Sequence, residues 1–530
     1  MPNNRSADAA AAANRFGLGA RPGTLQSLSD PRDALVQSIH GLESANGTQS
    51  TASAFAGLPS SAEYLASETQ FLLQRRERKL ALNATGATQT DSTQPDSTQT
   101  DSDRPARRNR RQFLQAAVGA PDDASQSNDL QAQQQRSPAP GGGFRKQFGE
   151  QLLAETSARW QVALAAPIGF DERLVRFWSN HFAVSVDKRQ ALLYAAPMER
   201  EVIRPLAFGR FADLLLGVET HPAMLRYLDN VKSIGPDSRV GERVAEMGNR
   251  GRTPKRQAGL NENLAREILE LHTLGVNGGY SQTDVTEFAR AITGWSLRGP
   301  RDGGTFSSDN AFVFRDNAHE PGARTVLGKR YADGGVGQGR RILADLAMNP
   351  ATAKHLAFKL ARHFVSDQPP PALVERMAKR YLDSGGSLSA LYLAMLQSDE
   401  AWSPDARKFR TPDDFLLAGL RVLGTQTIAQ PQQVSGLLGK LGQASFMPRS
   451  PAGFADTADA WIGPDALYKR IQTADALAAR APRSLDPNRV AQDALGVHLG
   501  HATAQAIQRA DSPHQALALL LASPDFQWRI

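Results

Sequence analysis

The strongest constraint on the fold of this chain is a long stretch, residues 84–143, that cannot build a hydrophobic core. It is rich in Thr, Gln, Asp, Ser, Pro and Gly, and three tandem near-copies of one pentapeptide begin at Thr88, Thr93 and Thr98. Segments of this composition bury too little apolar surface to offset the conformational entropy lost on ordering. We therefore predict that residues 84–143 form a disordered, low-complexity insertion in a chain that is otherwise folded.

The rest of the 530-residue chain predicts a mainly α fold, a multi-helical globular body. Apolar residues make up 41% of the chain and aromatic residues only 7%, while recurring Ala, Leu, Arg and Gln favour helices over strands. Around the insertion we expect an N-terminal helical segment packed on the main body (1–83), a helical core that carries the main motifs (144–424) and a C-terminal helical subdomain (425–530).

One segment, residues 306–331, departs from the helical pattern. Within it, residues 311–314 and 325–328 have the aromatic and β-branched composition of short strands, and they flank a turn. We therefore predict a small β-hairpin in this part of the chain.

Composition excludes several classes of protein and site. Cysteine is absent, which excludes disulfides, thiolate metal sites and a cysteine nucleophile. The net charge of +7 is spread along the chain, so nucleic acid is not expected as a partner. No apolar run approaches the length of about eighteen residues that a transmembrane helix needs, so no transmembrane segment is predicted.

The cellular compartment stays open. Residues 1–5 have no apolar core of an export signal, which favours the cytoplasm, whereas the absence of Cys suits the periplasm. Residues 109–120 resemble the core of a twin-arginine export signal, but they lie inside the insertion and end at Pro121. We interpret them as a short helical segment in a basic linker.

The densest cluster of candidate functional residues lies in one predicted amphipathic helix. Its carboxylates Glu262 and Glu267 suit acid/base or cation-binding chemistry, with Asn261, Asn263 and Arg266 as orienting or binding groups. The alternative is a solvated helix whose charges form weak i,i+4 ion pairs, such as Glu262 with Arg266.

Two histidines and an aspartate are further candidates. His181 lies in an aromatic run, where burial would hold it neutral, either as a general base or simply as a core residue. His319 lies beside Glu320 in the predicted hairpin, and loops carry functional sites more often than helices do. Asp284 follows a turn, and it either binds a ligand or only favours a helix N-terminus.

The motifs of several common enzyme classes are missing. The sequence contains no phosphate-binding loop, no dinucleotide fingerprint, no zincin motif and no nucleophile elbow. His355 and His363 stand eight residues apart on one predicted helix, too far for a local metal pair, and we interpret them as structural. No cofactor can be assigned from these residues.

Several short motifs nevertheless occur in a specific order. They are residues 14–19 (NRFGLG), 177–182 (FWSNHF), 261–263 (NEN) followed by 265–267 (ARE), Tyr280 with Asp284 and Val285, 293–295 (TGW), His319, and 523–527 (SPDFQ). In this order they resemble the bacterial family catalogued as domain of unknown function eighteen hundred, over nearly the whole chain except the insertion. The chain departs from the family pattern in the insertion and at His272, where relatives more often carry an aromatic residue.

The resemblance implies no activity, because the family has none established. It does imply a partner to test, since the family's genes often neighbour those of the family of unknown function catalogued as fifteen hundred and one, which resembles sulfatases and is often exported. It also gives weight to His181, Glu262, Glu267 and His319 as functional residues, because these positions match the family's motifs.

Three hypotheses for the function follow. In the first, the protein is a hydrolase or lyase acting on a saccharide or cell-envelope polymer, with Glu262 or Glu267 as acid/base and His181 and His319 assisting. In the second, it is a non-catalytic helical scaffold or partner of the neighbouring exported sulfatase-like protein. In the third, His181, Glu262 and His319 hold a metal ion.

The first hypothesis predicts that the candidate residues meet in one cleft. Trp178 or Trp295 would form its apolar wall, suited to a sugar ring. The other residues expected to bind ligand are Asn180, Asn261, Asn263, Arg266 and Asp284.

Overall fold

The computed structural model describes residues 2–44, 53–86, 142–249, 259–299, 302 and 311–530. The described chain is mainly α-helical, as predicted. It divides into two compact units, one made of residues 67–147 and the other of the rest of the chain. The predicted insertion lies outside the described residues apart from its first and last few, and the stretch 109–120 lies outside them entirely.

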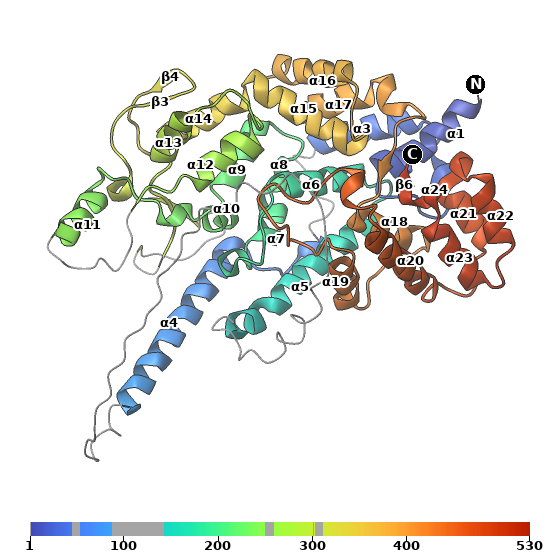
Figure 1. Cartoon of the computed structure of the whole chain (residues 1–530), viewed down its shortest axis with the longest axis horizontal. Helices are drawn as coiled ribbons and strands as arrows, with labels where there is room; N and C mark the ends of the chain where they lie inside the picture. The colour runs from blue at the N-terminus through green and yellow to red at the C-terminus, as the bar shows by residue number, and fades with distance from the viewer. Residues whose placement is uncertain (1, 45–52, 87–141, 250–258, 300–301, 303–310) are drawn as a thin grey trace, which may run out of the picture. The chain divides into compact units, whose positions relative to one another are not determined.

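The smaller unit contains parts of two helices, α4 (Ser61–Gly86) and α5 (Gly142–Ala165), which are labelled in Figure 1. In this unit the rings of Phe71 and Phe144 meet edge to face, with centroids 5.6 Å apart. Aromatic pairs favour this geometry, so the two helices contact each other through these rings.

Most helices belong to the larger unit. In chain order, those before residue 400 are α1 (Pro2–Ala11), α2 (Thr24–Ser27), α3 (Pro31–Ser44), α6 (Phe170–His181), α7 (Ala195–Met198), α8 (Arg204–Leu206), α9 (Phe211–Glu219), α10 (Pro222–Tyr227), α11 (Arg239–Asn249), α12 (Asn263–Glu267), α13 (Gln282–Ala291), α14 (Val336–Ala347), α15 (Pro350–Phe364), α16 (Pro371–Asp383) and α17 (Leu388–Leu396). Those after it are α18 (Pro412–Val422), α19 (Pro431–Lys440), α20 (Pro464–Ala478), α21 (Pro487–Leu495), α22 (His501–Gln508), α23 (Pro513–Ala522) and α24 (Pro524–Gln527).

Proline marks the start of many of these helices. The helices α15, α16, α18, α19, α20, α21, α23 and α24 each begin with it. Proline suits the first helical position because the N–H group there has no partner within the helix. The side chains just before α15, α18, α21 and α23, namely Asn349, Thr411, Asp486 and Ser512, accept a hydrogen bond from a first-turn N–H group and so cap the helix.

Helix α6 lies at the centre of the core of the larger unit. Figure 1 shows it beneath the layer formed by α15, α16 and α17. The Phe170 ring of α6 packs against the rings of Phe16 and Phe364, with centroids 6.3 and 5.5 Å away. At the other end of the helix, Trp178 is fully buried and donates a hydrogen bond to the hydroxyl of Tyr392 at 2.6 Å.

The strand predicted at 311–314 is present as β2 (Phe312–Phe314), and the one predicted at 325–328 only in part, because β3 (Arg324–Val326) ends at Val326; the two do not pair with each other. Strand β2 pairs antiparallel with β1 (Trp295–Leu297), and β3 pairs with β4 (Lys329–Tyr331). The small hairpin is therefore β3–β4. Its turn residues Leu327 and Gly328 have φ of 49° and 74°, as a two-residue hairpin turn with both central residues left-handed requires.

The C-terminal helices share one apolar cluster with α18 and the end of α5. Phe415, Leu477 and Leu520 lie in it, together with Trp160 and Leu164 of α5. Strand β5 (Lys408–Phe409) pairs with β6 (Trp528–Arg529), so the last residues of the chain lie next to the start of α18. The subdomain boundary expected after residue 424 falls between α18 and α19 and stays a prediction.

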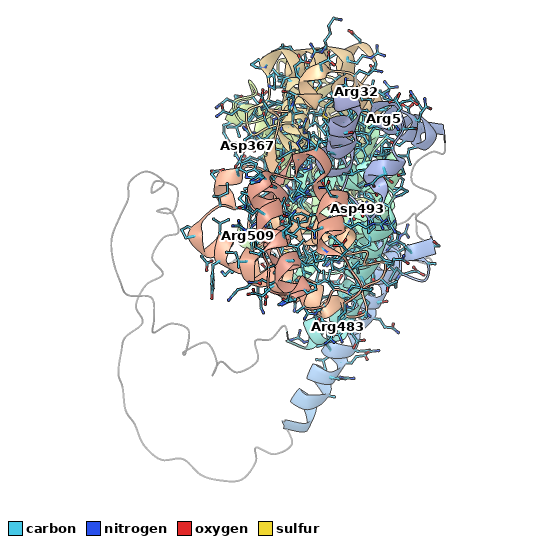
Figure 2. All side chains as sticks on the ribbon, turned by 90° about the vertical axis from the view of Figure 1, so that its right-hand side faces the viewer. Arg5, Arg32, Asp367, Arg483, Asp493 and Arg509 are labelled. Carbon is cyan, nitrogen blue, oxygen red and sulfur yellow. The ribbon has the colours of Figure 1, made fainter. Side chains whose placement is uncertain are left out.

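The surface of the larger unit carries many charged side chains. Arg5, Arg483 and Arg509 are exposed and are labelled in Figure 2. Within the described ranges, no helix combines the length and the apolar character needed to cross a bilayer.

Candidate functional site

Glu262 is engaged in a network between α12 and α13. Its carboxylate accepts hydrogen bonds from Arg266 at 3.1 Å, Gln282 at 2.8 Å and Thr286 at 2.7 Å. The hydrogen bond from Thr286 is the main reason that the pKa of Glu262 is lowered. The Glu262 carboxylate therefore stays ionised and links two helices, a structural role.

The two neighbouring asparagines also make local contacts. The side-chain oxygen of Asn261 accepts a hydrogen bond from the backbone N–H of Asn263 at 2.9 Å. The Asn261 amide also donates to the carbonyl of Asp229 at 3.4 Å. These bonds shape the turn that leads into α12.

Asp284 and His319 lie near the small strands. Asp284 accepts hydrogen bonds from Ser281 in a capping box at the start of α13, and its other oxygen accepts the N–H of Leu327 in the β3–β4 turn at 2.7 Å. His319 is buried, with Nδ1 3.0 Å from the carbonyl of Thr293. Both side chains therefore hold the β3–β4 region against α13.

The two tryptophans expected to form a wall are both core residues. Trp178 and Trp295 are fully buried, and Trp295 meets Phe312 edge to face. Neither ring presents a face to solvent, so neither is placed to stack on a sugar.

His181 is buried at the end of α6. Its Nε2 donates to the carbonyl of His272 at 3.1 Å, and its ring lies 6.2 Å from the ring of His355. Burial lowers the pKa of His181 well below its usual value, and the charge of Lys359 adds to the effect. His181 is therefore neutral at physiological pH.

Glu267 is the candidate whose carboxylate stays free. It is half-buried and, among the described residues, accepts no hydrogen bond and forms no ion pair. Burial raises its pKa, while His272 opposes the shift. This carboxylate suits proton transfer more than that of Glu262 does.

The four predicted catalytic residues are not joined to one another. In the part of the chain that the structure describes, no hydrogen bond or ion pair links any two of Glu262, Glu267, His181 and His319. Nor do the described residues include a group of three or more His, Asp or Glu side chains able to hold a metal ion. His181, Glu262 and His319 therefore do not form the metal site considered from the sequence.

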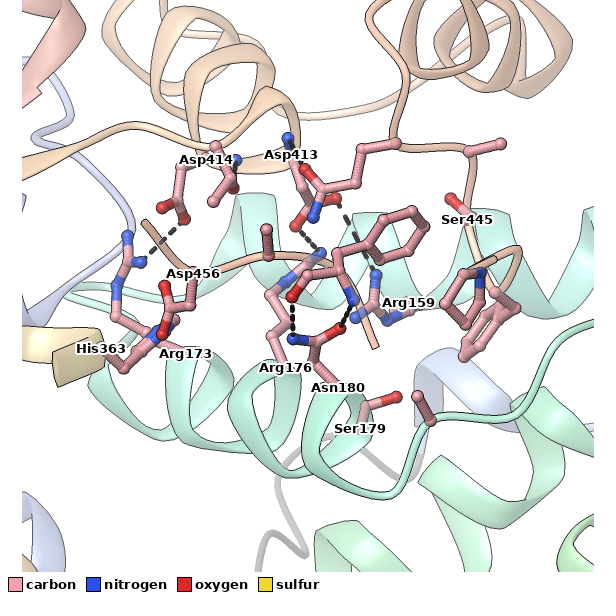
Figure 3. Close-up of a pocket in the computed structure, with 18 of the residues that line it drawn as sticks. Arg159, Arg173, Arg176, Ser179, Asn180, His363, Asp413, Asp414, Ser445 and Asp456 are labelled. Atoms are coloured by element: carbon pink, nitrogen blue, oxygen red, sulfur yellow. Dashed lines mark hydrogen bonds and ion pairs between the residues drawn. The ribbon is translucent and has the colours of Figure 1, made fainter. Parts of the chain in front are cut away.

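A pocket of about 90 Å³ lies instead along the middle and C-terminal turns of α6 (Figure 3). Its walls come from α5, α6, α15, the first turn of α18 and residues 443–456. Arg173, Arg176 and Asn180 of α6 line it. Their spacing of three and four residues places them on one face of that helix.

Acidic residues at the start of α18 pair with the arginines of α6. Arg173 contacts Asp414 at 2.7 Å, and Arg176 is bound to Asp413. Carboxylates in the first turn of a helix are favoured by the helix dipole. Arg159 of α5 approaches the same Asp413 at 4.0 Å, so two guanidinium groups share this carboxylate.

Some guanidinium nitrogens in this pocket remain without a partner. In the described residues, Nε and Nη2 of Arg176 and Nη2 of Arg173 are buried and donate no hydrogen bond. Burial lowers the pKa of Arg173 to about 10. It also lowers the pKa of Arg176, with Arg159 adding to that shift. These nitrogens are therefore unpaired donors on arginines that line the pocket.

Beside Arg173, the lining of the pocket carries a histidine–carboxylate pair (Figure 3). Nδ1 of His363, at the end of α15, lies 3.0 Å from Oδ2 of Asp456, and Nε2 of His363 has no hydrogen-bond partner. Burial lowers the pKa of His363, although Asp456 opposes the shift. The pKa of Asp456 is lowered too, because His363 and Lys408 outweigh its burial. The pair is therefore a neutral imidazole held by an ionised carboxylate.

Asn180 positions the loop that closes the pocket. Its side-chain oxygen accepts the N–H of Phe454 at 2.8 Å, and its amide donates to the carbonyl of Phe454 at 2.9 Å. The residue before, Gly453, has φ of 82°, and a Cβ there would lie 2.4 Å from the backbone oxygen of Asn180. Glycine is thus required where this loop meets α6.

The substitution Gly453→Ala is therefore expected to lower the free energy of unfolding by about 2 to 4 kcal/mol. An alanine at this positive φ has a strained backbone, and its Cβ would clash with the backbone of α6. Urea unfolding followed by circular dichroism measures the change. Gly436→Ala is the matched control: Gly436 lies within α19 with open space around it, so the alanine should be neutral or stabilise by up to about 1 kcal/mol. Equal stabilities for the two variants would refute the proposed contact.

Sequence reasoning found one residue of this pocket and missed the others. Asn180 was a predicted binding residue, whereas Arg173 and Arg176 were not chosen, although helical periodicity places them on its face. His363 was interpreted as structural because it stands eight residues from His355, too far for a local metal pair, and its partner Asp456 lies 93 residues away in the sequence. No local pattern links residues at such a separation.

Comparison with known protein families finds one match. A family model described as "Protein of unknown function (DUF1800)" matches residues 11–528 of the chain. Comparisons with curated proteins and with solved structures find no match.

Proposed function

The chain belongs to the DUF1800 family of proteins of unknown function, and we propose that it is an acid–base enzyme, a hydrolase or lyase, with its active site in the pocket beside α6. The observation that carries the proposal is that the pair His363–Asp456 lines the same pocket as Arg159, Arg173 and Arg176. The proposed substrate is a saccharide or cell-envelope polymer that carries anionic groups.

In this proposal His363 is the general base. If Nδ1 donates its proton to Asp456, the lone pair of Nε2 is free to accept a proton. The lowered pKa keeps the ring neutral at pH 7, which is the form a base needs. Asp456 acts as a positioning residue, because its carboxylate holds the ring and stabilises the imidazolium that forms.

The arginines would hold the anionic group. Nε and Nη2 of Arg176 share one edge of the guanidinium, and both are unpaired. Such an edge binds two oxygens of a carboxylate, sulfate or phosphate at once. If the substrate is a uronate, His363 would start an elimination by removing the proton from the carbon next to the carboxylate. If the substrate is an ester or a glycoside, His363 would remove a proton from the attacking water.

The test is cleavage of a polymer panel by the purified full-length protein: a polyuronate, a sulfated polysaccharide and a glycerol-phosphate polymer, with released fragments identified by mass spectrometry. We expect cleavage of at least one polymer, and a loss of at least about 100-fold in kcat for His363→Gln. Activity should also fall as the pH drops through the pKa of His363, below its usual value of about 6.5, because protonation removes the base.

The matched control is His514→Gln. His514 also pairs with a carboxylate, Asp475 at 3.1 Å, but on the exposed surface of α23, so this variant should keep full activity. Thermal unfolding of both variants separates loss of catalysis from loss of fold. If no polymer is cleaved, or if His363→Gln is as active as the unmodified protein, the enzyme proposal fails.

The second candidate is a non-catalytic scaffold or partner of the neighbouring exported sulfatase-like protein. It is favoured by the closed network of Glu262, Arg266, Gln282 and Thr286, in which polar motif residues serve internal contacts. A scaffold would cleave none of the polymers and would co-purify with that protein. Cleavage without co-purification would exclude it.

A further inference from the structure

One face of α15 carries three basic side chains in a row. His355, Lys359 and His363 follow one another at intervals of four residues, which stacks them one turn apart on one side of the helix. This face packs on α6: the ring of His355 lies 6.2 Å from His181, and the ring of His363 lies 5.4 Å from Phe177. Lys359 is therefore held between two neutral histidines and the end of α6.

Lys359 is unusual in having no partner. It is half-buried, yet among the described residues its ammonium forms no ion pair and no hydrogen bond. The Nζ atom of Lys359 is not fully buried, so it keeps some contact with solvent. Lys354, one turn earlier on α15, is exposed and paired with Glu375 at 2.5 Å, the ordinary arrangement for a lysine.

The charges around Lys359 do not compensate for its burial. The pKa of Lys359 is lowered to about 8, mainly by burial; Asp456 from the 443–456 loop only partly opposes this shift, and Arg362 on the same helix adds to it. The two histidines nearby, His181 and His355, are themselves held neutral, the latter with a pKa of about 4. A sizeable fraction of Lys359 is therefore uncharged amine at neutral pH, the nucleophilic form of lysine.

From this placement we propose that Lys359 is a reactive amine that forms an imine with the carbonyl group of a small aldehyde or ketone ligand. The Nζ lone pair attacks the carbonyl carbon and forms the C–N bond; one proton leaves Nζ and the carbonyl oxygen takes one up, which gives a carbinolamine. The oxygen then leaves as water, Nζ loses its remaining proton, and the C=N bond forms. No oxidant or reductant is required. The proposal goes beyond the acid–base function, and its test needs no turnover.

The test traps the imine by reduction. The full-length protein is incubated with sodium cyanoborohydride and either glyceraldehyde, a neutral sugar aldehyde, or pyruvate, a 2-oxo acid, and the labelled lysines are located by mass spectrometry of peptides. At pH 7.5 we expect Lys359 to be labelled at least about tenfold faster than Lys354, because the free-amine fraction follows the lower pKa. Labelling of Lys359 should be half-maximal near pH 8.

The two probes distinguish the ligand class. Faster labelling by pyruvate would indicate that the charge of Arg362 recruits a carboxylate, whereas equal rates or faster labelling by glyceraldehyde would indicate a sugar-type carbonyl. Lys359→Met, which keeps the apolar stem, should abolish the fast label and leave labelling of Lys354 unchanged. The proposal is overturned if neither probe labels Lys359 faster than Lys354 at pH 7.5.

Discussion

Replacing Asp414 with asparagine is expected to lower the free energy of unfolding by about 3 to 5 kcal/mol. Asp414 contacts Arg173 at 2.7 Å and Arg529 at 3.5 Å, and the three side chains are 7%, 1% and 0% exposed. Arg410, also fully buried, lies close enough to influence the same carboxylate. Removing the carboxylate charge leaves three buried cations that repel one another.

The pH dependence of this effect has a definite sign. Burial would raise the pKa of Asp414, but Arg173 and Arg529 outweigh it and lower the pKa far below its usual value. The contribution to stability is therefore complete above the unfolded pKa of about 4 and is lost only as the pH falls through the folded pKa. Urea unfolding between pH 5 and 8 should show a constant difference between Asp414→Asn and the unmodified protein, and the difference should shrink in stronger acid.

The matched control for this variant is Asp383→Asn. Asp383 is half-exposed on α16 and pairs with Lys379 at i,i+4, a geometry that contributes about 0.5 kcal/mol at most. If the two asparagine variants lose the same small amount of stability, the buried cluster does not depend on Asp414 as described.

Replacing Arg421 with methionine is expected to lower the free energy of unfolding by a similar amount, about 3 to 5 kcal/mol. Arg421 of α18 is 1% exposed and donates to the carbonyls of Gly19, Ala163, Ala166 and Pro167 at 2.7 to 2.8 Å. Methionine fills much of the same volume but donates nothing. Four carbonyl groups would lose their bond to Arg421, each at a cost of about 1 kcal/mol or more.

The physical role of Arg421 is to cap α5. That helix ends at Ala165, and its last carbonyl groups carry partial negative charge. The guanidinium satisfies several of them and ties them to the turn at Gly19.

Arg509→Met is the control, since Arg509 is exposed on the C-terminal helices (Figure 2) and should change the stability by less than about 0.5 kcal/mol. A loss below about 1 kcal/mol for Arg421→Met, measured by urea unfolding, would contradict the capping role.

Much of the secondary structure was predictable because it depends on local pattern. The mainly α fold follows from composition and apolar spacing, and β2 and β3 were recognisable from their aromatic and β-branched residues. Their pairing was not predictable, since β2 pairs with β1 rather than with β3, which is nearer in the sequence. Strand pairing depends on where the neighbouring helices place each strand. The alternation of apolar and polar residues within one strand does not reveal that placement.

The predicted helix around Glu262 shows the limit of periodicity in another way. The chain is α-helical over Asn263–Glu267 and then π-helical over Ile268–His272. A π-helical turn closes its hydrogen bonds over five residues instead of four, so positions after it turn to a different face. His272 is consequently fully buried against Glu219 at 2.8 Å, a contact that an ideal helix did not predict.

The sequence by itself determined which of the described segments are helical and where proline and capping residues start them, because both depend on residues a few positions apart. Only the tertiary structure decided which polar residues meet. Arg173 and Asp414 are separated by 241 residues, and His363 and Asp456 by 93. Such pairs form because packing of α6 against α15 and α18 buries their charges together, where each needs a partner.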